Sequence, residues 1–372
     1  MPRMLRRLLP TLLAAFLLTS CQFLGEPELS LPPQVRIHWL HGFYTMDSDT
    51  QLDYAKEMDA ISLGWARLEY MDGELLVNSG WGHDNDWIRP ENADETLTAL
   101  ASRSVPCNLN IYGTSSTFRA LAEAGSLKDA ADAFVAAAHP YAGLTVDIEG
   151  LRTASRSDFS DFMALLRSAL PADKLLYVCV PPDTWYGGYD FRVLGDLCDR
   201  VILMAHDYQW TSIPQEKVGQ TDTYSPLSPL PQVETALQHV TDLETGVRDV
   251  SKVALQIAFN SCGLHVDENG AILDTTLYHP ATNTIAKRLA QTDSVREWDE
   301  ASGNPSLWYY TEDGSRYRLW YEDVQSIQAK LELCAKYGVT GVSIWRLGSI
   351  PSYPNIAHYD TWALLTGPSL RS

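Results

Sequence analysis

The sequence predicts an α/β fold: a (β/α)₈ TIM barrel with a small α+β insertion between its seventh and eighth strands. Short β-rich runs alternate with longer helical stretches from residue 35 onward, and eight such runs are found. The chain has 372 residues, and barrels of this kind run past about 250 residues as one unit. The runs cover residues 35–40, 60–63, 106–112, 143–147, 175–180, 200–205, 252–257 and 341–344.

Helical stretches separate these runs in the order that a barrel requires. The clearest candidates cover residues 127–138, 157–169, 231–243 and 323–337. In the last of these, Val324, Ile327, Leu331 and Cys334 recur at roughly helical spacing, and Gly338 follows as a C-cap. The alternation favours a closed barrel over a doubly wound sheet, although closure itself is not visible in a sequence.

One gap between runs is too long for a simple strand-to-helix connection. Residues 262–318 contain two turn signals, a helical stretch near 283–291 and aromatic β-rich segments around Trp298 and at 308–310. We expect a small α+β insertion here. Because it follows a barrel strand, it is expected on the carboxyl face, where it would wall one side of the active cleft.

The amino terminus has the order of an export signal. Residues 1–20 carry three arginines, then an apolar run over residues 8–18, then small polar residues. Residues 18–21 resemble a bacterial lipobox, in which Cys21 becomes the lipidated first residue of the mature chain. The alternative is an ordinary signal cleaved nearby, with Cys21 incidental. We expect residues 21–33 to be a tether, residues 34–372 to be the barrel domain, and the protein to be lipid-anchored in the cell membrane, facing outside the cytoplasm.

Charge and cysteine content exclude several function classes. The chain has 28 Lys and Arg against 47 Asp and Glu, a net charge of −19. No stretch is basic enough for a row of phosphates, so nucleic acid is not an expected partner. Five cysteines follow Cys21 without paired spacing, which does not support a disulfide framework or a metal site.

The most informative segment is residues 143–149. Strand side chains alternate faces, so Leu144, Val146 and Ile148 point one way. Thr145, Asp147 and Glu149 then point the other way, into the barrel and up to its carboxyl rim. Two neighbouring carboxylates repel each other, which raises one pKa and can keep one carboxylic acid protonated near neutral pH. Alternatively, Glu149 caps the next helix and Asp147 makes structural hydrogen bonds.

Four ordered motifs over residues 35–350 resemble glycoside hydrolase family 18, the chitinase-like family. The segment 143–149 is similar to its strand-four signature D-G-x-D-x-D-x-E, and Met204-Ala205-His206-Asp207 is similar to its M-x-Y-D motif. Trp345 lies where that family keeps the Trp that floors the reacting sugar subsite. The segments 320–323 and 345–348, with the insertion before strand eight, resemble the branch of spore-cortex-lytic N-acetylglucosaminidases.

The resemblance implies substrate-assisted, retaining cleavage of a glycan that carries N-acetylglucosamine. Glu149 would protonate the leaving oxygen and then activate water, while Asp147 orients the 2-acetamido group whose carbonyl attacks the anomeric carbon. Asp207 would hydrogen-bond near the same subsite. No metal or organic cofactor is implied.

The sequence departs from the family pattern in three places. The outermost Asp is Ala142 and the inner Asp is Thr145. The motif Tyr that donates to the acetamido oxygen is His206, which can also donate a hydrogen bond; Tyr208 is a second candidate. These departures leave open a degenerate barrel that binds glycan without cutting it.

Five aromatic residues and one methionine near the predicted carboxyl rim are the candidates for substrate binding. They are Trp39, Trp65, Tyr112, Met204, Tyr208 and Trp345. Rings at a barrel mouth can stack on sugar faces, although each one alone can equally be packing. Asp183 and Arg346 are further candidates. Arg346 could contact an acidic substituent of the substrate or pair with a structural acid.

The sequence therefore predicts an exported, lipid-anchored glycosidase that cleaves β-linked N-acetylglucosamine in peptidoglycan or a chitin-like glycan. The alternatives are the degenerate glycan-binding barrel and an endo-N-acetylglucosaminidase that acts on glycoprotein glycans. The expected partners are the glycan and, through the lipid anchor only, the membrane.

Overall fold

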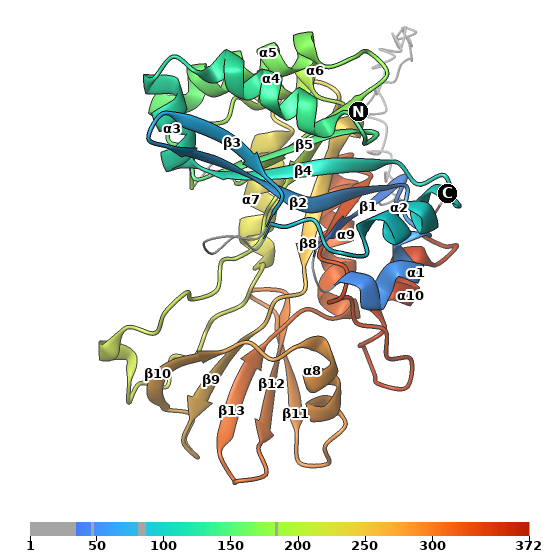
Figure 1. The fold of residues 1–372 in the computed structure, drawn as a ribbon. Helices are drawn as coiled ribbons and strands as arrows, with labels where there is room; N and C mark the ends of the chain where they lie inside the picture. Colours follow the sequence, from blue (N-terminus) through green and yellow to red (C-terminus); the bar gives the residue numbers. More distant parts are fainter. Residues whose placement is uncertain (1–34, 46–47, 81–86, 183–184, 372) are drawn as a thin grey trace, which may run out of the picture. The chain divides into compact units, whose positions relative to one another are not determined.

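Eight parallel strands close into a barrel in the computed structural model, which describes residues 35–45, 48–80, 87–182 and 185–371 (Figure 1). The expected signal, the tether, Cys21 and Asp183 lie outside the described residues. The strands run in the order β1-β14-β8-β7-β6-β5-β4-β2, and β2 pairs with β1 to close the ring. The predicted fold class is confirmed. The strands are β1 (Trp39–Tyr44), β2 (Ala60–Met71), β4 (Cys107–Thr114), β5 (Gly143–Glu149), β6 (Leu175–Val180), β7 (Arg200–Leu203), β8 (Val253–Ala258) and β14 (Gly341–Trp345).

Helices cover the outer face of the barrel and bury the outward side chains of its strands. Leu144, Val146 and Ile148 of β5 are at most 1% exposed and belong to the main hydrophobic core. That core also holds Phe159 and Phe162 of α5. The helices are α1 (Leu52–Ala55), α2 (Ala93–Ala101), α3 (Ser115–Glu123), α4 (Leu127–Ala138), α5 (Arg156–Ala169), α6 (Phe191–Leu197), α7 (Leu230–Val240), α9 (Val324–Lys336) and α10 (Thr361–Thr366). No described helix is both long and apolar enough to cross a membrane.

Two strands differ by more than two residues at an end from their predicted extent, and pairing explains both differences. The first strand was expected at residues 35–40, but Trp39 pairs with Gly341 and His41 with Ala60, so β1 covers residues 39–44. The second was expected to end at residue 63. It continues to Met71 and turns at Asp72-Gly73 into β3 (Glu74–Asn78), which pairs antiparallel with it. Asp-Gly with φ of 52° and 82° is a favoured two-residue hairpin turn.

A second, antiparallel sheet lies between β8 and β14 in the chain. Its order is β10-β9-β13-β12-β11. One face packs Leu307 and Leu319 with Ile285 of α8. The strands are β9 (Cys262–Val266), β10 (Ile272–Tyr278), β11 (Val295–Asp299), β12 (Asn304–Tyr310) and β13 (Arg316–Trp320), with α8 at Thr282–Leu289.

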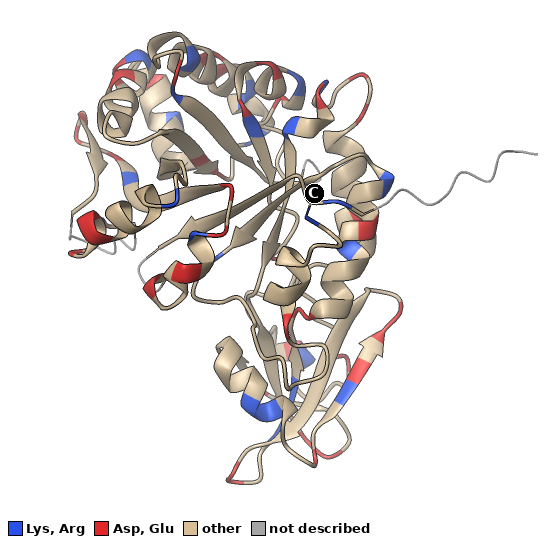
Figure 2. Ribbon diagram, turned by 90° about the vertical axis from the view of Figure 1, so that its right-hand side faces the viewer, with Lys and Arg blue, Asp and Glu red and all other residues tan. Residues whose placement is uncertain are grey.

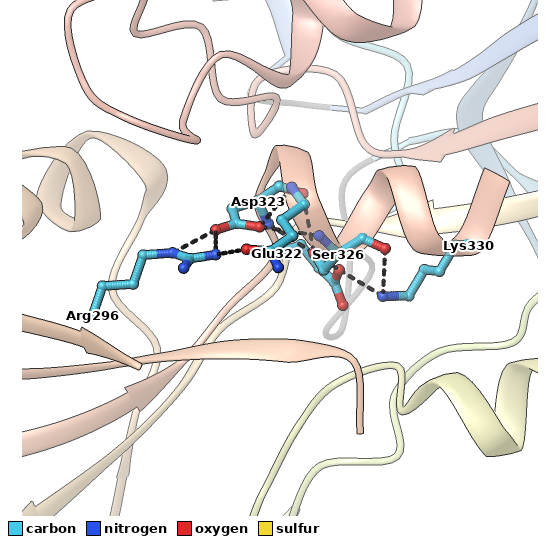
Figure 3. A network of polar contacts seen from close by, with 6 residues as sticks. Arg296, Glu322, Asp323, Ser326 and Lys330 are labelled. Carbon is cyan, nitrogen blue, oxygen red and sulfur yellow. Dashed lines mark hydrogen bonds and ion pairs between the residues drawn. The ribbon is translucent and has the colours of Figure 1, made fainter. Parts of the chain in front are cut away.

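A buried ionic network joins this second sheet to helix α9 (Figure 3). Asp323 caps α9 by accepting from the backbone N–H of Ser326, and it also binds Arg296 of β11 at 2.6 Å. Glu322 accepts from Lys330 at 2.8 Å, and both side chains are at most 2% exposed. The network therefore fixes the start of α9, and the insertion with it, against the barrel.

Acidic residues lie on the barrel helices and loops and on the second sheet, with basic residues among them (Figure 2). The charge is therefore spread over several elements and is not concentrated on one of them. The five described cysteines are all buried and none is bonded to another.

Candidate active site

The carboxyl end of β5 places two carboxyl groups on one side of the barrel wall. Asp147 pairs in register with Tyr112 of β4, and Glu149 pairs with Thr114. The alternate residues of β5 lie in the outer core. Thr145, Asp147 and Glu149 therefore face the barrel interior, as the alternation predicts.

Asp147 is the more deeply buried of the two carboxyl groups. It is 3% exposed, and its Oδ2 accepts from Asn110 Nδ2 at 3.5 Å. Its Oδ1 is buried without a hydrogen-bond partner among the described residues. Burial, and then repulsion from Glu149, raise the pKa of Asp147 well above its ordinary value. This site therefore favours a protonated Asp147.

Glu149 is the last residue of β5, nearer the carboxyl end of the strand than Asp147, and its side chain faces a cavity. Burial raises its pKa; His206 opposes that shift and Asp207 adds to it. A raised pKa suits a general acid, because the carboxyl group keeps its proton closer to neutral pH. The cavity has a volume of about 260 Å³. Its lining includes Thr114, Ser115, Glu149, Gly150, Pro181, Trp185, Tyr186, Met204, His206 and Asp207.

His206 lies in this lining with both ring nitrogens engaged. Nδ1 is 2.7 Å from Asp207 Oδ2 and Nε2 is 2.6 Å from Gln256 Oε1. Two acceptors for one ring fit a doubly protonated imidazolium. Burial lowers the pKa of His206, but Asp207, Gln256 and Glu149 together raise it above its ordinary value. In this arrangement neither N–H is available to a sugar, which differs from the donor role expected for His206.

Asp207 is held as a carboxylate. Its Oδ1 accepts from Asn260 Nδ2 at 3.1 Å and Gln209 Nε2 at 3.3 Å, and its Oδ2 faces His206. Burial opposes ionisation, but these contacts, led by His206, lower the pKa of Asp207 to about 2. Its backbone is left-handed, with φ of 64°, which is uncommon for a residue other than Gly and clusters at functional sites. Sequence reasoning missed Gln256, Gln209 and Asn260, for which no motif signal exists.

A chain of hydrogen bonds occupies the barrel interior below Asp147. Thr145 Oγ1 lies 2.6 Å from Ser62 Oγ, which lies 2.8 Å from His41 Nε2. The Nδ1 of His41 lies 2.8 Å from Ser343 Oγ. Burial, with Arg200 adding to it, lowers the pKa of His41 to about 3, so this ring is neutral. Thr145 thus takes part in a neutral network and places no charge beside Asp147.

Aromatic rings line another part of the barrel mouth. Trp345, the last residue of β14, contacts Phe43 at 5.4 Å and Trp87 at 5.7 Å between ring centroids. Trp87 stacks on Tyr112 at 4.7 Å, with 7° between the ring planes. Its ring lies over Gly64, where a Cβ would come within 3.1 Å of the indole. Trp87 was not predicted, because it lies far from any strand end in the sequence.

The expected positions of Trp39 and Trp65 at the carboxyl rim are wrong. Because β1 begins at Trp39, that ring lies at the amino end of the barrel, stacked on His41 and 7% exposed. Trp65 lies in the middle of the long strand β2 and is fully buried in the outer core, against Tyr44. The errors follow directly from the extents predicted for these two strands.

Of the two remaining candidates, Met204 and Tyr208, only Met204 lines the cavity, beside Glu149. Tyr208 packs edge-on against Trp185 at 4.6 Å, and its hydroxyl is buried without a partner among the described residues. Tyr208 is not among the residues that line the cavity.

A second cavity, of about 360 Å³, lies next to the residues that hold Asp207. Its wall includes Gln209 and Asn260, which donate to Asp207. Arg346, which follows β14, and His279, which follows β10, line it as well. The first cavity is therefore lined by Asp207 and the second by its hydrogen-bond donors.

Comparison with known proteins adds a family match. The model of glycosyl hydrolases family 18 matches residues 38–349. The cortical fragment-lytic enzyme of Bacillus subtilis (strain 168) is 26% identical over 238 residues, which cover 59% of this chain and 48% of that protein. The chain spans about half the length of the curated relatives it matches.

Solved structures of low sequence identity share the fold. The spore cortex-lytic enzyme SleL of Bacillus cereus superposes with a TM-score of 0.66 at 14% identity, covering 91% of this chain and 76% of that one. A family 18 N-acetylglucosaminidase from Paenibacillus barengoltzii superposes with a TM-score of 0.61 at 17% identity, covering 84% and 96%.

Proposed function

This chain belongs to glycosyl hydrolases family 18, and from that membership we propose that it hydrolyses β-linked N-acetylglucosamine in peptidoglycan or a chitin-like glycan. One observation carries the proposal: Asp147 and Glu149 face inward at the carboxyl end of β5, each with a raised pKa. This is the end of a barrel where catalytic residues lie. The relatives named as cortex-lytic enzymes support a cell-wall glycan as substrate.

The placement of the two carboxyl groups supports substrate-assisted catalysis. Both extend from one face of one strand, two residues or about 6.7 Å apart. Carboxyl groups that act as acid and opposing nucleophile must flank the glycosidic bond from two sides. Two groups from the same strand approach from one side, which leaves the opposite face of the anomeric carbon to the substrate's own acetamido oxygen.

The different surroundings of Glu149 and Asp147 determine the proton transfers. Protonated Glu149 gives its proton to the glycosidic oxygen as the acetamido carbonyl oxygen bonds to the anomeric carbon and the leaving alcohol departs. The two carboxyl groups share one proton in the reactive state. When that proton lies on Glu149, ionised Asp147 accepts a hydrogen bond from the acetamido N–H and balances the positive charge of the oxazolinium ion. Glu149, now a carboxylate, removes a proton from water, which attacks the same carbon and restores the acetamido group with net retention.

The two cavities, one lined by Asp207 and one by its hydrogen-bond donors, support a polymeric substrate over a single sugar. Volumes of about 260 and 360 Å³ are at the scale of small-molecule sites. Trp345 and the stacked pair Trp87 and Tyr112 add ring faces to the mouth. We propose that successive sugars occupy these hollows.

We also propose that the mature protein is anchored in the membrane by a lipid on Cys21. The support is the lipobox-like sequence at residues 18–21. Detergent phase partition after expression in a bacterial host tests this. The full chain should enter the detergent phase and Cys21→Ser should stay in the aqueous phase; equal partition of the two would exclude the anchor.

Hydrolysis of a chito-oligosaccharide and of purified peptidoglycan between pH 4 and 8 tests the activity. Wild type should release reducing ends, and Glu149→Gln should lower kcat by at least about 100-fold, because general acid–base catalysis contributes that much. Glu123→Gln, at an exposed position on α3, is the matched control and should leave the rate unchanged.

The same assay, with cosedimentation of the wild type with peptidoglycan beside it, decides the alternative of a glycan-binding barrel. That alternative is favoured by His206, whose two ring nitrogens are both engaged and cannot donate to an acetamido oxygen. Glycan binding without turnover by wild type would establish the alternative and overturn the enzyme.

A further inference from the structure

A cavity of about 350 Å³ lies on the second sheet, away from β5. Its wall combines Trp320 of β13, Arg318 beside it, Glu297 and Asp299 of β11, and Tyr224 from the connection after β7. Tyr224 is 43% exposed, and it is the one aromatic residue among the exposed large hydrophobic residues in the described part of the chain. An exposed ring at the edge of a polar hollow has a free face for stacking.

The polar side chains of this cavity are held in place by one another. Arg318 lies between the rings of Trp308 and Trp320, 4.9 and 4.8 Å from their centroids, and donates to Thr223 Oγ1 at 2.7 Å. Glu297 Oε2 accepts from Trp308 Nε1 at 2.8 Å and lies 3.6 Å from Arg318. The cavity is therefore rigid before any ligand enters, which lowers the entropic cost of binding.

The ring of Tyr224 is fixed as well. It meets Trp320 edge-on at 5.5 Å. Trp320 is anchored through Nε1 to the carbonyl oxygen of Thr223 at 2.6 Å. On the carboxylate edge, Ser302 donates to Asp299 Oδ2 at 2.6 Å. The aromatic edge and the carboxylate edge of the cavity are thus each anchored by contacts within the protein.

The charges in this wall restrict what can bind. Glu297 is paired with Arg318 and Asp299 accepts from Ser302, so much of the charge in this wall is already compensated. A neutral ligand with many hydroxyl groups suits such a wall, because it can donate to the carboxylates, accept from the guanidinium and lay an apolar face on an aromatic ring. A sugar ring has these properties.

We propose that this cavity is an accessory carbohydrate-binding site for neutral sugars of a polymeric glycan. It is separate from the catalytic centre, since the two cavities share no lining residue. This proposal rests on the proposed function in one respect: the expectation that the bound sugars are N-acetylated. Its role is to hold the protein on an insoluble polymer while the barrel acts on a chain.

Cosedimentation of the full chain with insoluble chitin and with peptidoglycan tests the site. All variants carry Glu149→Gln, so that the polymer is not consumed. Tyr224→Ala should bind roughly five- to tenfold more weakly, the loss expected for one ring contact, and Glu297→Gln should also bind more weakly. Tyr224→Phe keeps the ring and should bind as the parent does. Leu273→Ala, an exposed apolar residue on β10, is the matched control.

Hydrolysis separates this proposal from the catalytic one. With Glu149 intact, Tyr224→Ala should lower the rate on insoluble polymer while the rate on soluble chitohexaose stays within about twofold. Thermal unfolding confirms that each variant is folded. Unchanged binding by both Tyr224→Ala and Glu297→Gln, or no polymer binding by the parent chain, overturns the accessory site. Absence of turnover with Tyr224-dependent binding overturns the hydrolase and keeps the site.

Discussion

Asp147 and Asp207 are carboxyl groups of one site whose pKa values shift in opposite directions. Burial and Glu149 raise the pKa of Asp147, whereas the donors around Asp207, led by His206, lower its pKa to about 2 despite burial. The two residues therefore contribute to stability with opposite signs. Asp147 weakens the fold as pH rises above the ordinary Asp value of about 3.9, and Asp207 stabilises the fold above that value.

Asp147→Asn should consequently raise the melting temperature at pH 7, by roughly 2–4 °C. A neutral amide removes the cost of a buried carboxyl group that must either ionise in a poor environment or keep its proton. The gain should shrink toward pH 4, where Asp147 is protonated in the folded state and about half protonated in the unfolded state. Calorimetry at pH 4, 5.5 and 7 measures this effect.

Asp207→Asn is the control, because its expected effect on the melting temperature is opposite in sign. It removes a carboxylate whose stabilisation is present above about pH 4 and is lost as pH falls toward 2. It should lower the melting temperature at pH 7. Destabilisation by Asp147→Asn at pH 7 would show that the hydrogen bonds of Asp147 outweigh its desolvation.

Helix α9 shows how one element connects the insertion to the barrel. Its N-cap residue is Asp323, which binds Arg296 of β11, and its second turn holds Lys330, which binds Glu322 (Figure 3). Asn304 of β12 also donates to Glu322 at 2.8 Å. Because Glu322 and Lys330 are buried, neither can regain water if its partner is removed.

Lys330→Met should therefore destabilise the protein by about 3–5 kcal/mol, the usual cost of an uncompensated buried charge. Urea unfolding gives the change in the free energy of unfolding. Lys336→Met on the same helix is the matched control, since Lys336 pairs with Glu234 at the surface, and it should cost about 1 kcal/mol or less. Adding Glu322→Gln to Lys330→Met should recover part of the loss. Equal effects of the two lysine changes would contradict the role of the buried pair.

The whole molecule carries a large negative charge. Removal of residues 1–20 takes away three arginines, so the mature chain would carry −22, which is −19 minus 3. Long-range attraction to an acidic wall polymer is therefore absent, and contact must rest on short-range stacking and hydrogen bonds.

Salt should affect acidic and neutral substrates differently. Raising ionic strength from about 10 to 150 mM shortens the Debye length from about 30 to 8 Å and screens repulsion between the chain and acidic peptidoglycan. KM for peptidoglycan should fall by about two- to fivefold, whereas KM for neutral chitohexaose should not change. A KM for peptidoglycan that rises with salt would indicate a basic contact surface.

Local sequence patterns determined much of the fold and of the candidate site. The α/β class follows from alternation along the chain, whereas the choice of a closed barrel also depended on the family motifs. The inward orientation of Asp147 and Glu149 follows from the two-residue period of a strand, which needs no distant partner. The motif containing His206 and Asp207 and the last residue of β14 were also identifiable from the sequence.

Only the tertiary structure decided which residues complete the site. Gln256 reaches His206 from another strand, and Trp87 reaches Trp345 from a connection after the β2–β3 hairpin. Trp39 and Trp65 were misplaced because strand register and length are set by pairing with neighbouring strands. An apolar residue satisfies either face of a strand that is buried on both sides, so its sequence pattern does not specify which face it occupies.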